Sequence, residues 1–324
     1  MEKVKLRILY SDLRPELEII EKELEQAVQS SSHLLNDASL HLLQAGGKRI
    51  RPVFVLLAAK FGDYDAATVR NVAVPLELIH MASLVHDDVI DDSEVRRGEP
   101  TVKAQWNNRV AMYTGDFMFA RALEHAAAVR NPVLHEVLAK AIIEVCRGEI
   151  IQIEDKSQLD QNLRSYLRRI KRKTALLISS SCELGGLAAG ADPATVAHLR
   201  RFGYFIGMSF QIIDDVLDFT ASDAELGKPA GSDFLQGNIT LPILFARDDE
   251  KLQALLQRTL GEELTDRQRL DVVEEVRESA GIRRSKELSD RYLQKALREL
   301  AALPDIPSKK ALRDLAFFIG KRKF

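Results

Sequence analysis

The stretch 83-SLVHDDVIDDSEVRRGEPT-101 decides how the chain is interpreted, because it places several aspartates directly behind an apolar segment. Asp87, Asp88 and Asp91 stand at positions i, i+1 and i+4. A helix turns about 100° per residue, so at least two of these carboxylates point from one helical face into one small volume. Carboxylates in an apolar frame need cations to be tolerated. The stretch therefore predicts a helix that carries a metal site.

A second acid motif lies far downstream, in the stretch 210-FQIIDDVLDFT-220, and has the same spacing. Its members are Asp214, Asp215 and Asp218. Each motif follows an apolar run, LELIHMASLV before the first and FIGMSFQII before the second. A charged helix surface would explain one such motif, but it explains two motifs behind apolar runs poorly. We expect both motifs to lie on the walls of a cavity.

The ligand chemistry of the two motifs favours Mg²⁺. All of their ligands are oxygen atoms, and Mg²⁺ binds through a few carboxylates, waters and substrate phosphates. We expect the six aspartates to bind Mg²⁺, and Mg²⁺ to bind phosphate groups. The pair His86-Asp87 also suggests a metal-dependent phosphohydrolase, but that chemistry needs further histidine ligands, and the other histidines form no matching cluster in the sequence.

Composition narrows the class of protein. The 46 basic and 48 acidic residues give a net charge of -2, which provides no general attraction to nucleic acid. Cys146 and Cys182 each lie in an apolar, helix-like segment, so we expect buried thiols in a reducing compartment. No apolar run approaches the roughly 20 residues that span a bilayer, and the start lacks a secretory apolar core. These features predict a cytoplasmic protein.

Helical periodicity dominates the chain. The segment LRPELEIIEKELEQAV has an apolar stripe typical of an amphipathic helix. That stripe is formed by Leu17, Ile20, Leu24 and Val28. The pairs Asp192-Pro193 and Thr265-Asp266 are typical helix starts, and strand-like alternation is nearly absent. We predict a single all-α domain over residues 1–324, with roughly ten or more helices of ordinary length.

Three basic elements accompany the acid motifs. Arg96 and Arg97 follow the first motif closely enough to reach the same cavity mouth, where guanidinium groups bind diphosphate oxygens. In GGKRIRP, residues 46–52, two glycines free the backbone and three cations follow. In RRIKRKTALL, Lys173 and Thr174 stand at the head of an apolar helix. The basic elements predict binding of phosphate groups beside the acid motifs.

Taken in order, these elements resemble the motifs of the trans-polyprenyl diphosphate synthases. The matching elements are GGKRIRP, DDVID followed by RRG, Gly115-Asp116, Lys173-Thr174, and FQIIDDVLD with GKPAGSD behind it. The resemblance implies a large antiparallel helical bundle around a deep central cavity. The approach ASLVHDD, the stretch GNITLP and the ending FIGKRKF are most similar to the bacterial branch of the family that makes heptaprenyl diphosphate.

The resemblance assigns roles to individual positions. The positions matching isopentenyl diphosphate ligands are Lys48, Arg51, His80 and Arg97. Those matching contacts to the allylic diphosphate or the developing cation are Arg96, Lys173, Thr174, Gln211 and Lys228. The matching magnesium ligands are Asp87, Asp88, Asp91, Asp214, Asp215 and Asp218. Asn238 departs from the pattern, because many relatives have lysine in this stretch, and its role is left open.

The implied reaction is the Mg²⁺-dependent head-to-tail condensation of isopentenyl diphosphate with an allylic diphosphate such as farnesyl diphosphate. The product is a long all-trans polyprenyl diphosphate, heptaprenyl or another length of about six to ten units, delivered to the membrane for a quinone side chain. The implied partner is a smaller, dissimilar helical regulatory subunit, with a homodimer as the alternative. A terpene cyclase would not need Lys48, Arg51 and Arg97, and a non-catalytic subunit would lose carboxylates that this chain retains.

Product length is expected to depend on residues just before the first acid motif. If Asp87 faces the cavity, Ala82 and Ser83, one turn earlier, line the path leading away from the diphosphates. Bulky aromatic residues near these positions close the path in short-chain relatives, whereas small residues leave it open toward Leu78 and Ile79. Tight helix packing is the alternative explanation for the two small residues. The interpretation as a product path predicts a long product.

Overall fold

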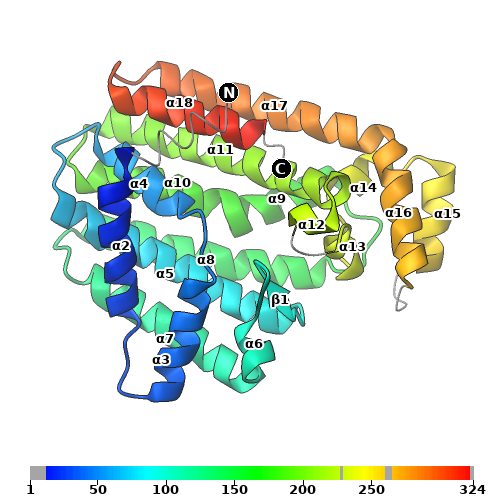
Figure 1. Ribbon diagram of the computed structural model, residues 1–324. Helices are drawn as coiled ribbons and strands as arrows, with labels where there is room; N and C mark the ends of the chain where they lie inside the picture. The colour runs from blue at the N-terminus through cyan, green and yellow to red at the C-terminus, as the bar shows by residue number, and fades with distance from the viewer. Residues whose placement is uncertain (1–11, 227–228, 260–264, 322–324) are drawn as a thin grey trace.

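The computed structural model describes residues 12–226, 229–259 and 265–321, and these are almost wholly helical, as the periodicity predicts (Figure 1). The α-helices are α2 (Arg14–Ala27), α3 (His33–Gln44), α4 (Ile50–Ala59), α5 (Ala66–Ile90), α6 (Val102–Gln105), α7 (Asn108–Ala126), α8 (Pro132–Glu154), α9 (Leu163–Ile170), α10 (Leu176–Ala188), α11 (Pro193–Thr220), α12 (Asp223–Leu226), α13 (Ser232–Leu235), α14 (Leu241–Ala246), α15 (Glu250–Thr259), α16 (Asp266–Glu278), α17 (Ala280–Ala301) and α18 (Pro307–Gly320). A π-helix, η1 (Lys171–Ala175), joins α9 to α10, and a two-stranded hairpin, β1 (Val95–Arg96) and β2 (Glu99–Pro100), follows α5.

The bundle is organised around α11, which packs mainly against α10 and α17, while α5 packs against α7 and α4. Figure 1 shows α11, α17 and α18 running side by side along one edge of the molecule. Small residues allow the close approach of α10 to its neighbours. A Cβ atom at Gly185 would lie 2.4 Å from the carbonyl oxygen of Val55, and one at Gly203 would lie 2.8 Å from that of Ile178. Larger residues there would force the helices apart.

Two hydrophobic clusters fill the bundle, and α11 contributes to both. Its first half, with Phe202 and Ile206, packs into the cluster formed with α4, α5 and α7. Its second half, with Ile212 and Phe219, packs into a second cluster with α9, α14 and α16. The second acid motif lies on this second half, so packing on both sides holds the motif in place. A position held in this way is suited to metal ligands, which need fixed geometry.

The predicted helix starts are confirmed. The side chain of Asp192 accepts hydrogen bonds from the backbone N–H groups of Ala194 and Thr195, each at 3.0 Å. Thr265 and Gln268 form a capping box at the start of α16. Both arrangements satisfy backbone donors that a helix end would otherwise leave unpaired.

The prediction of two buried thiols is right for Cys182 and wrong for Cys146, which is exposed. Burial raises the pKa of the Cys182 thiol well above its usual value. Cys146 lies on α8 beside Ile143 and Ile150, which are exposed as well. Its apolar sequence surroundings therefore reflect an apolar surface of the helix and not the core. Among the described residues, no helix combines the length and the apolar character that a membrane span requires.

Candidate active site

The first acid motif lies at the C-terminal end of α5, which ends at Ile90 and is capped by Asp91. Carboxylates at this end face the negative pole of the helix dipole, which disfavours their charge and favours a nearby cation. Asp87 and Asp88 are both buried. Within the described part of the chain, Asp87 Oδ1 and Asp88 Oδ2 have no hydrogen-bond partner. Unsatisfied carboxylate oxygens of this kind fit a site for divalent cations.

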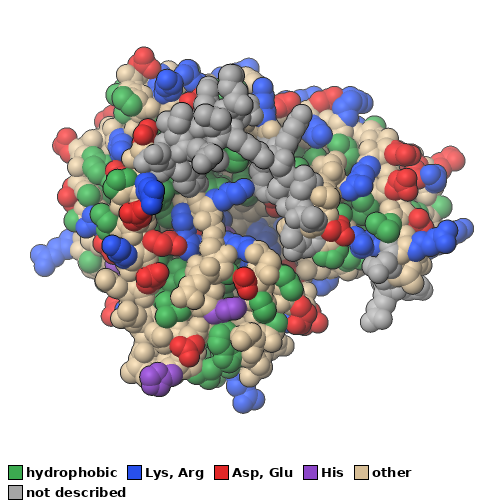
Figure 2. Space-filling model, viewed as in Figure 1, with side chains coloured by type: hydrophobic (Ala, Val, Ile, Leu, Met, Phe, Trp, Pro, Cys, Tyr) green, Lys and Arg blue, Asp and Glu red, His purple; other side chains and the backbone are tan. Residues whose placement is uncertain are grey.

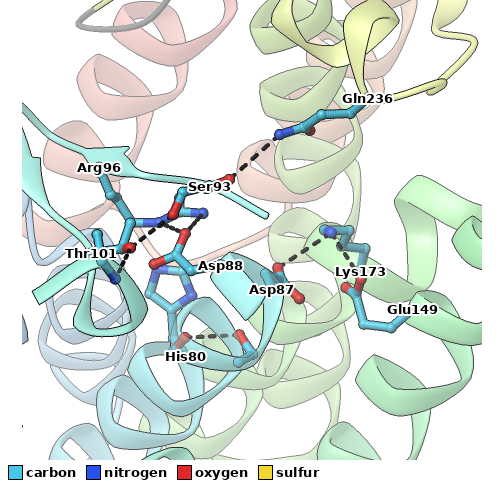
Figure 3. Close-up of polar contacts among 11 residues, drawn as sticks. His80, Asp87, Asp88, Ser93, Arg96, Thr101, Glu149, Lys173 and Gln236 are labelled. Atoms are coloured by element: carbon cyan, nitrogen blue, oxygen red, sulfur yellow. Dashed lines mark hydrogen bonds and ion pairs between the residues drawn. The ribbon is translucent and has the colours of Figure 1, made fainter. Parts of the chain in front are cut away.

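Two cationic side chains already approach the first motif (Figure 3). Arg96 contacts Asp88 Oδ1 through Nε at 2.7 Å and Nη2 at 2.6 Å. Lys173 Nζ lies 3.3 Å from Asp87 Oδ2 and 2.9 Å from Glu149 Oε2. Figure 3 shows the Lys173 ammonium group between the two carboxylates. The lysine therefore links η1 to α5 and α8 at the acid end of the site.

The hairpin after α5 separates the two adjacent arginines. Arg96 turns back to Asp88, whereas Arg97, with a positive φ of 58°, turns to GGKRIRP. A Cβ atom at Gly47 would lie only 2.7 Å from Arg97 Nη1. Neighbouring positions in the sequence thus contribute to two different parts of the site.

The second acid motif occupies the last turns of α11, and its members have different surroundings. Asp215 is fully engaged: Oδ2 accepts a hydrogen bond from Tyr166 Oη at 2.6 Å and Oδ1 accepts one from Gln211 Nε2 at 2.8 Å. Asp218 accepts hydrogen bonds from the Ser232 hydroxyl group at 3.0 Å and from the backbone N–H group of Asp233 at 3.3 Å. These contacts orient the end of α11 and the following loop.

A π-helical turn connects the two halves of the site. Because η1 is wider than an α-helical turn, it alters the register just where Lys173 and Thr174 occur, and π turns are frequent at functional sites. The Thr174 hydroxyl group donates to Gln211 Oε1 at 2.6 Å. Together with the contacts of Asp215, this gives a chain of hydrogen bonds from Thr174 through Gln211 and Asp215 to Tyr166. The amide of Gln211 is thereby held in one orientation.

Burial disfavours the negative charge of four acids at this end of the site. It raises the pKa values of Asp88 and Asp91 above their ordinary range. Burial, with the charge of Asp87, raises the pKa of Glu149 to about 7. Burial, with the charge of Asp233, raises the pKa of Asp215 to about 7, although the hydrogen bonds to Asp215 oppose this. These buried carboxyl groups lose their protons less readily than exposed ones, and a bound cation would stabilise their charged forms. The set of oxygen donors therefore fits divalent cations.

No group of three or more His, Cys, Asp or Glu side chains among the described residues is close enough to hold a metal ion alone. The two motifs instead line one cavity together. A magnesium ion that binds to one or two carboxylates takes its other ligands from water and phosphate oxygens. The arrangement therefore fits metal ions that bind together with a diphosphate.

The cavity wall also contains a second cationic region, separate from Lys173 and the acid motifs. Arg51, His80 and Arg97 all line the cavity. Burial, followed by the charges of Arg51 and Arg97, lowers the pKa of His80 well below its usual value, so this imidazole is neutral. Burial lowers the pKa of Arg51 to about 10, which still leaves its guanidinium group charged. Two cations and a neutral hydrogen-bonding ring suit a second diphosphate.

The cavity has a volume of about 850 Å³. Figure 2 shows lysine and arginine side chains gathered around the hollow on this face. The predicted site residues in its wall are Arg51, His80, Ser83, Asp87, Asp91, Arg96, Arg97, Lys173, Thr174, Gln211, Asp214, Asp215 and Asp218. Gln236 donates to the Ser93 hydroxyl oxygen at 3.4 Å and joins the two sides of the mouth (Figure 3).

Four of the predicted positions are not in this wall, as far as the described residues form it. Asp88 lies behind Arg96, and Lys48 lies with its ammonium group 5.8 Å from the Phe318 ring centre. Ala82 is fully buried in helix packing, whereas its neighbour Ser83 lines the cavity. Lys228 lies outside the described residues. Asn238, whose role the sequence left open, is part of the wall.

Sequence reasoning missed Glu149 and Tyr166, which both line the cavity and contact predicted residues. Neither belongs to a motif. One of the four glutamates in α8 and the tyrosine in α9 look like ordinary helical residues, and only their contacts with Lys173 and Asp215 distinguish them.

A helical bundle with two aspartate motifs on one cavity, beside a separate cluster of arginines and a neutral histidine, is the arrangement expected of a prenyltransferase that acts on isoprenoid diphosphates. The chain belongs to the polyprenyl synthetase family, whose model matches residues 32–277.

The chain is similar to heptaprenyl diphosphate synthase component 2 of Geobacillus stearothermophilus, with 59% identity over 99% of this chain and 100% of the relative. The Bacillus subtilis protein of the same name is 54% identical over 99% of this chain and 92% of the relative. Among solved structures, heptaprenyl diphosphate synthase from Staphylococcus aureus matches with a TM-score of 0.91 and 44% identity, over 96% of this chain and 99% of the other. A polyprenyl synthase from Caulobacter crescentus, complexed with calcium and isoprenyl diphosphate, matches with a TM-score of 0.94 and 32% identity, over 98% and 97% of the two chains.

Proposed function

We propose that this chain is the catalytic subunit of a heptaprenyl diphosphate synthase. It condenses isopentenyl diphosphate with an allylic diphosphate, such as farnesyl diphosphate, in Mg²⁺-dependent head-to-tail steps. The observation that carries the proposal is the division of one cavity into an acid end and a separate arginine–histidine region. Two diphosphates can occupy these two regions at once. The full-length similarity to two heptaprenyl diphosphate synthase components supports the chain length.

The acid end would bind the allylic diphosphate. The carboxylates that we assign to Mg²⁺ are those of the two motifs that line the cavity, Asp87, Asp91, Asp214, Asp215 and Asp218. Magnesium, when bound, supplies positive charge against the diphosphate as it leaves. Lys173 adds a fixed cation beside Asp87. The side chains thus hold charge in place before it is needed, which avoids reorganisation during the reaction.

The chain of hydrogen bonds through Gln211 would stabilise the allylic cation. Its amide nitrogen donates to Asp215 and its amide oxygen accepts from Thr174, so the dipole cannot turn freely. The Phe210 ring also lines the cavity, and an aromatic face attracts a cation. Among the described side chains that line the cavity, none is an evident base for the final proton loss, and both Asp215 oxygens are engaged in hydrogen bonds. We assign that proton to the released diphosphate.

The arginine–histidine region would hold isopentenyl diphosphate. Arg51 and Arg97 supply charge, and the neutral His80 ring supplies a hydrogen bond. Holding the two reactants side by side converts a collision into a positioned step. A terpene cyclase has no use for this second region, which is why we favour chain elongation.

We further propose that the chain works with a second, dissimilar chain. The relatives named component 2 imply another component. Half of the large hydrophobic side chains that are exposed among the described residues lie on α7 and α8, where such a chain would cover them. These residues are Met112, Tyr113, Leu123, Val133, Ile143, Ile150 and Ile153. The alternative is that two copies of this chain cover the same surface.

Product analysis tests both proposals. The chain is incubated with farnesyl diphosphate and labelled isopentenyl diphosphate, alone and with the smaller protein encoded for the same pathway, with Mg²⁺ or with EDTA. We expect seven-unit products that need Mg²⁺ and both chains. Consumption of farnesyl diphosphate without isopentenyl diphosphate would identify a cyclase. Full turnover by a dimer of this chain alone would exclude the obligatory second chain.

A further inference from the structure

Glu77 is a buried acid that the proposed mechanism does not use. It lies on α5, ten positions before Asp87, and only 3% of its surface is exposed. Burying a carboxylate is costly unless charges or donors compensate it. Its partners therefore indicate why the chain carries an acid at this position.

The direct partner of Glu77 is Arg49, the first of the two arginines in GGKRIRP. Arg49 Nη1 lies 3.4 Å from Glu77 Oε1. The same guanidinium group donates to both oxygens of Glu21 on α2, with Nε at 2.7 Å from Oε2 and Nη2 at 2.6 Å from Oε1, and to the Leu43 carbonyl oxygen at 3.2 Å. Arg49 is thus held by protein acceptors and is not in the cavity wall formed by the described residues. It joins α2 to α5 and is not available to bind a diphosphate.

The two arginines that do line the cavity lie near the same carboxylate. The charge of Glu77 favours the charged forms of Arg51 and Arg97, and so opposes the effect of burial on both. Arg97 and Arg49 both lie beside Gly47. A Cβ atom at Gly47 would lie 2.7 Å from Arg97 Nη1 and 3.2 Å from Arg49 Nη1. Glu77 Oε2 and Arg51 Nε have no hydrogen-bond partner within the described ranges. One guanidinium group, that of Arg49, therefore contacts the acid, and those of Arg51 and Arg97 lie close enough for its charge to act on them.

The balance of positive and negative charges explains why one acid suits this position. Without it, three guanidinium groups in a region of low dielectric would repel one another and move apart. A second acid aimed at Arg51 and Arg97 would neutralise them and weaken their attraction for an anion. Glu21 already neutralises Arg49 from the outer side. Glu77 therefore leaves net positive charge on the side that faces the cavity.

We propose that Glu77 is a positioning residue for the second diphosphate subsite: its buried negative charge offsets the repulsion among the guanidinium groups and so keeps Arg51 and Arg97 together in the cavity wall. Glu77 does not line the cavity among the described residues, whereas Arg51, Arg97 and His80 do, so it acts through them. The inference rests on the proposed function, in which this subsite binds isopentenyl diphosphate.

The test is a pair of binding titrations that need no turnover. Isothermal titration calorimetry measures isopentenyl diphosphate and, in the presence of Mg²⁺, farnesyl thiodiphosphate as an unreactive allylic analogue. The full chain is used, together with its partner if the two form a stable complex. Glu77→Gln keeps the shape of the side chain and removes its charge. Glu23→Gln is the control, because it also removes an acid paired with an arginine: Glu23 Oε1 lies 2.7 Å from Arg70 Nε. Unlike Arg51 and Arg97, Arg70 is not in the cavity wall formed by the described residues.

We expect Glu77→Gln to weaken the binding of isopentenyl diphosphate at least tenfold and to change that of the allylic analogue less than twofold. Glu23→Gln should change neither. Unchanged or tighter binding of isopentenyl diphosphate by Glu77→Gln would overturn the inference, as would an equal loss for both ligands. If Glu77→Gln does not fold, Glu77→Asp decides: a smaller loss confined to isopentenyl diphosphate supports positioning, and a loss for both ligands or neither refutes it. Failure of the wild type to bind isopentenyl diphosphate would instead refute the proposed function.

Discussion

A single methyl group at Gly47 should weaken the second diphosphate subsite. Gly47 precedes Lys48 in GGKRIRP, and its missing side chain leaves room for the guanidinium group of Arg97. The Cβ atom of an alanine would lie 2.7 Å from Arg97 Nη1 and 3.1 Å from Cζ. Ordinary contacts between such atoms are about 3.5–4.0 Å, so the guanidinium group must move by about 1 Å.

The size of the effect follows from what Arg97 contributes. A hydrogen bond to a charged group contributes about 1.5–3 kcal/mol, and 1.4 kcal/mol corresponds to a tenfold change in affinity. If the displaced arginine loses one such bond to the diphosphate, Gly47→Ala should raise the Kd for isopentenyl diphosphate about 10- to 100-fold. The Kd of an allylic analogue should hardly change, because that ligand binds at the acid end.

The neighbouring glycine offers a matched control. Gly46 has a positive φ of 77° and Gly47 one of 155°, so an alanine strains the backbone at either position, by about 1–2 kcal/mol at Gly46. A Cβ atom there would have no neighbour within 4 Å. Urea unfolding should therefore show both variants destabilised, while calorimetric titration should show weak isopentenyl diphosphate binding for Gly47→Ala alone. Equal affinities in the two variants would refute the argument that Gly47 makes room for Arg97.

Three further predictions concern other parts of the site. Asp214→Ala should reduce turnover by orders of magnitude with an unchanged circular dichroism spectrum, and near-normal turnover by the folded variant would contradict a mechanism with two motifs. Ser83→Phe should shorten the product to about three or four units on chromatography, because Ser83 lines the cavity; an unchanged length would mean that the chain grows along another path. Glu149, with a pKa of about 7 in the folded state against an ordinary 4.5, binds a proton between these values that the unfolded chain does not bind. The free energy of unfolding of the metal-free protein should thus fall by up to about 3 kcal/mol between pH 4.5 and 7, at about 1.4 kcal/mol per pH unit, and Glu149→Gln should remove this part of the fall in urea titrations. Equal pH slopes for variant and wild type would show that Glu149 does not titrate in this range.

Local patterns in the chain were sufficient for the parts of the protein that depend on neighbouring residues. The caps at Asp192 and Thr265 were predicted because capping is a contact over two or three residues, and both are confirmed. Cys146 shows the limit of such patterns. An apolar surface of α8 and a buried one look alike in a single sequence, and only the packed structure distinguishes an exposed thiol from a core thiol.

By itself, the sequence determined the two acid motifs, because the spacing of Asp87 to Asp91 and its repeat at Asp214 to Asp218 directs carboxylates to one helical face wherever the helix lies. The class of protein followed from the resemblance of these motifs and the basic elements to a known family. Only the tertiary structure decided how each acid is used. It placed Lys173 between Asp87 and Glu149, on three different helical segments, and it gave Asp215 two protein donors. Such contacts join residues many positions apart and depend on burial. The charge that a buried group can carry is set by the desolvation and the neighbours that packing provides, and no local spacing encodes either.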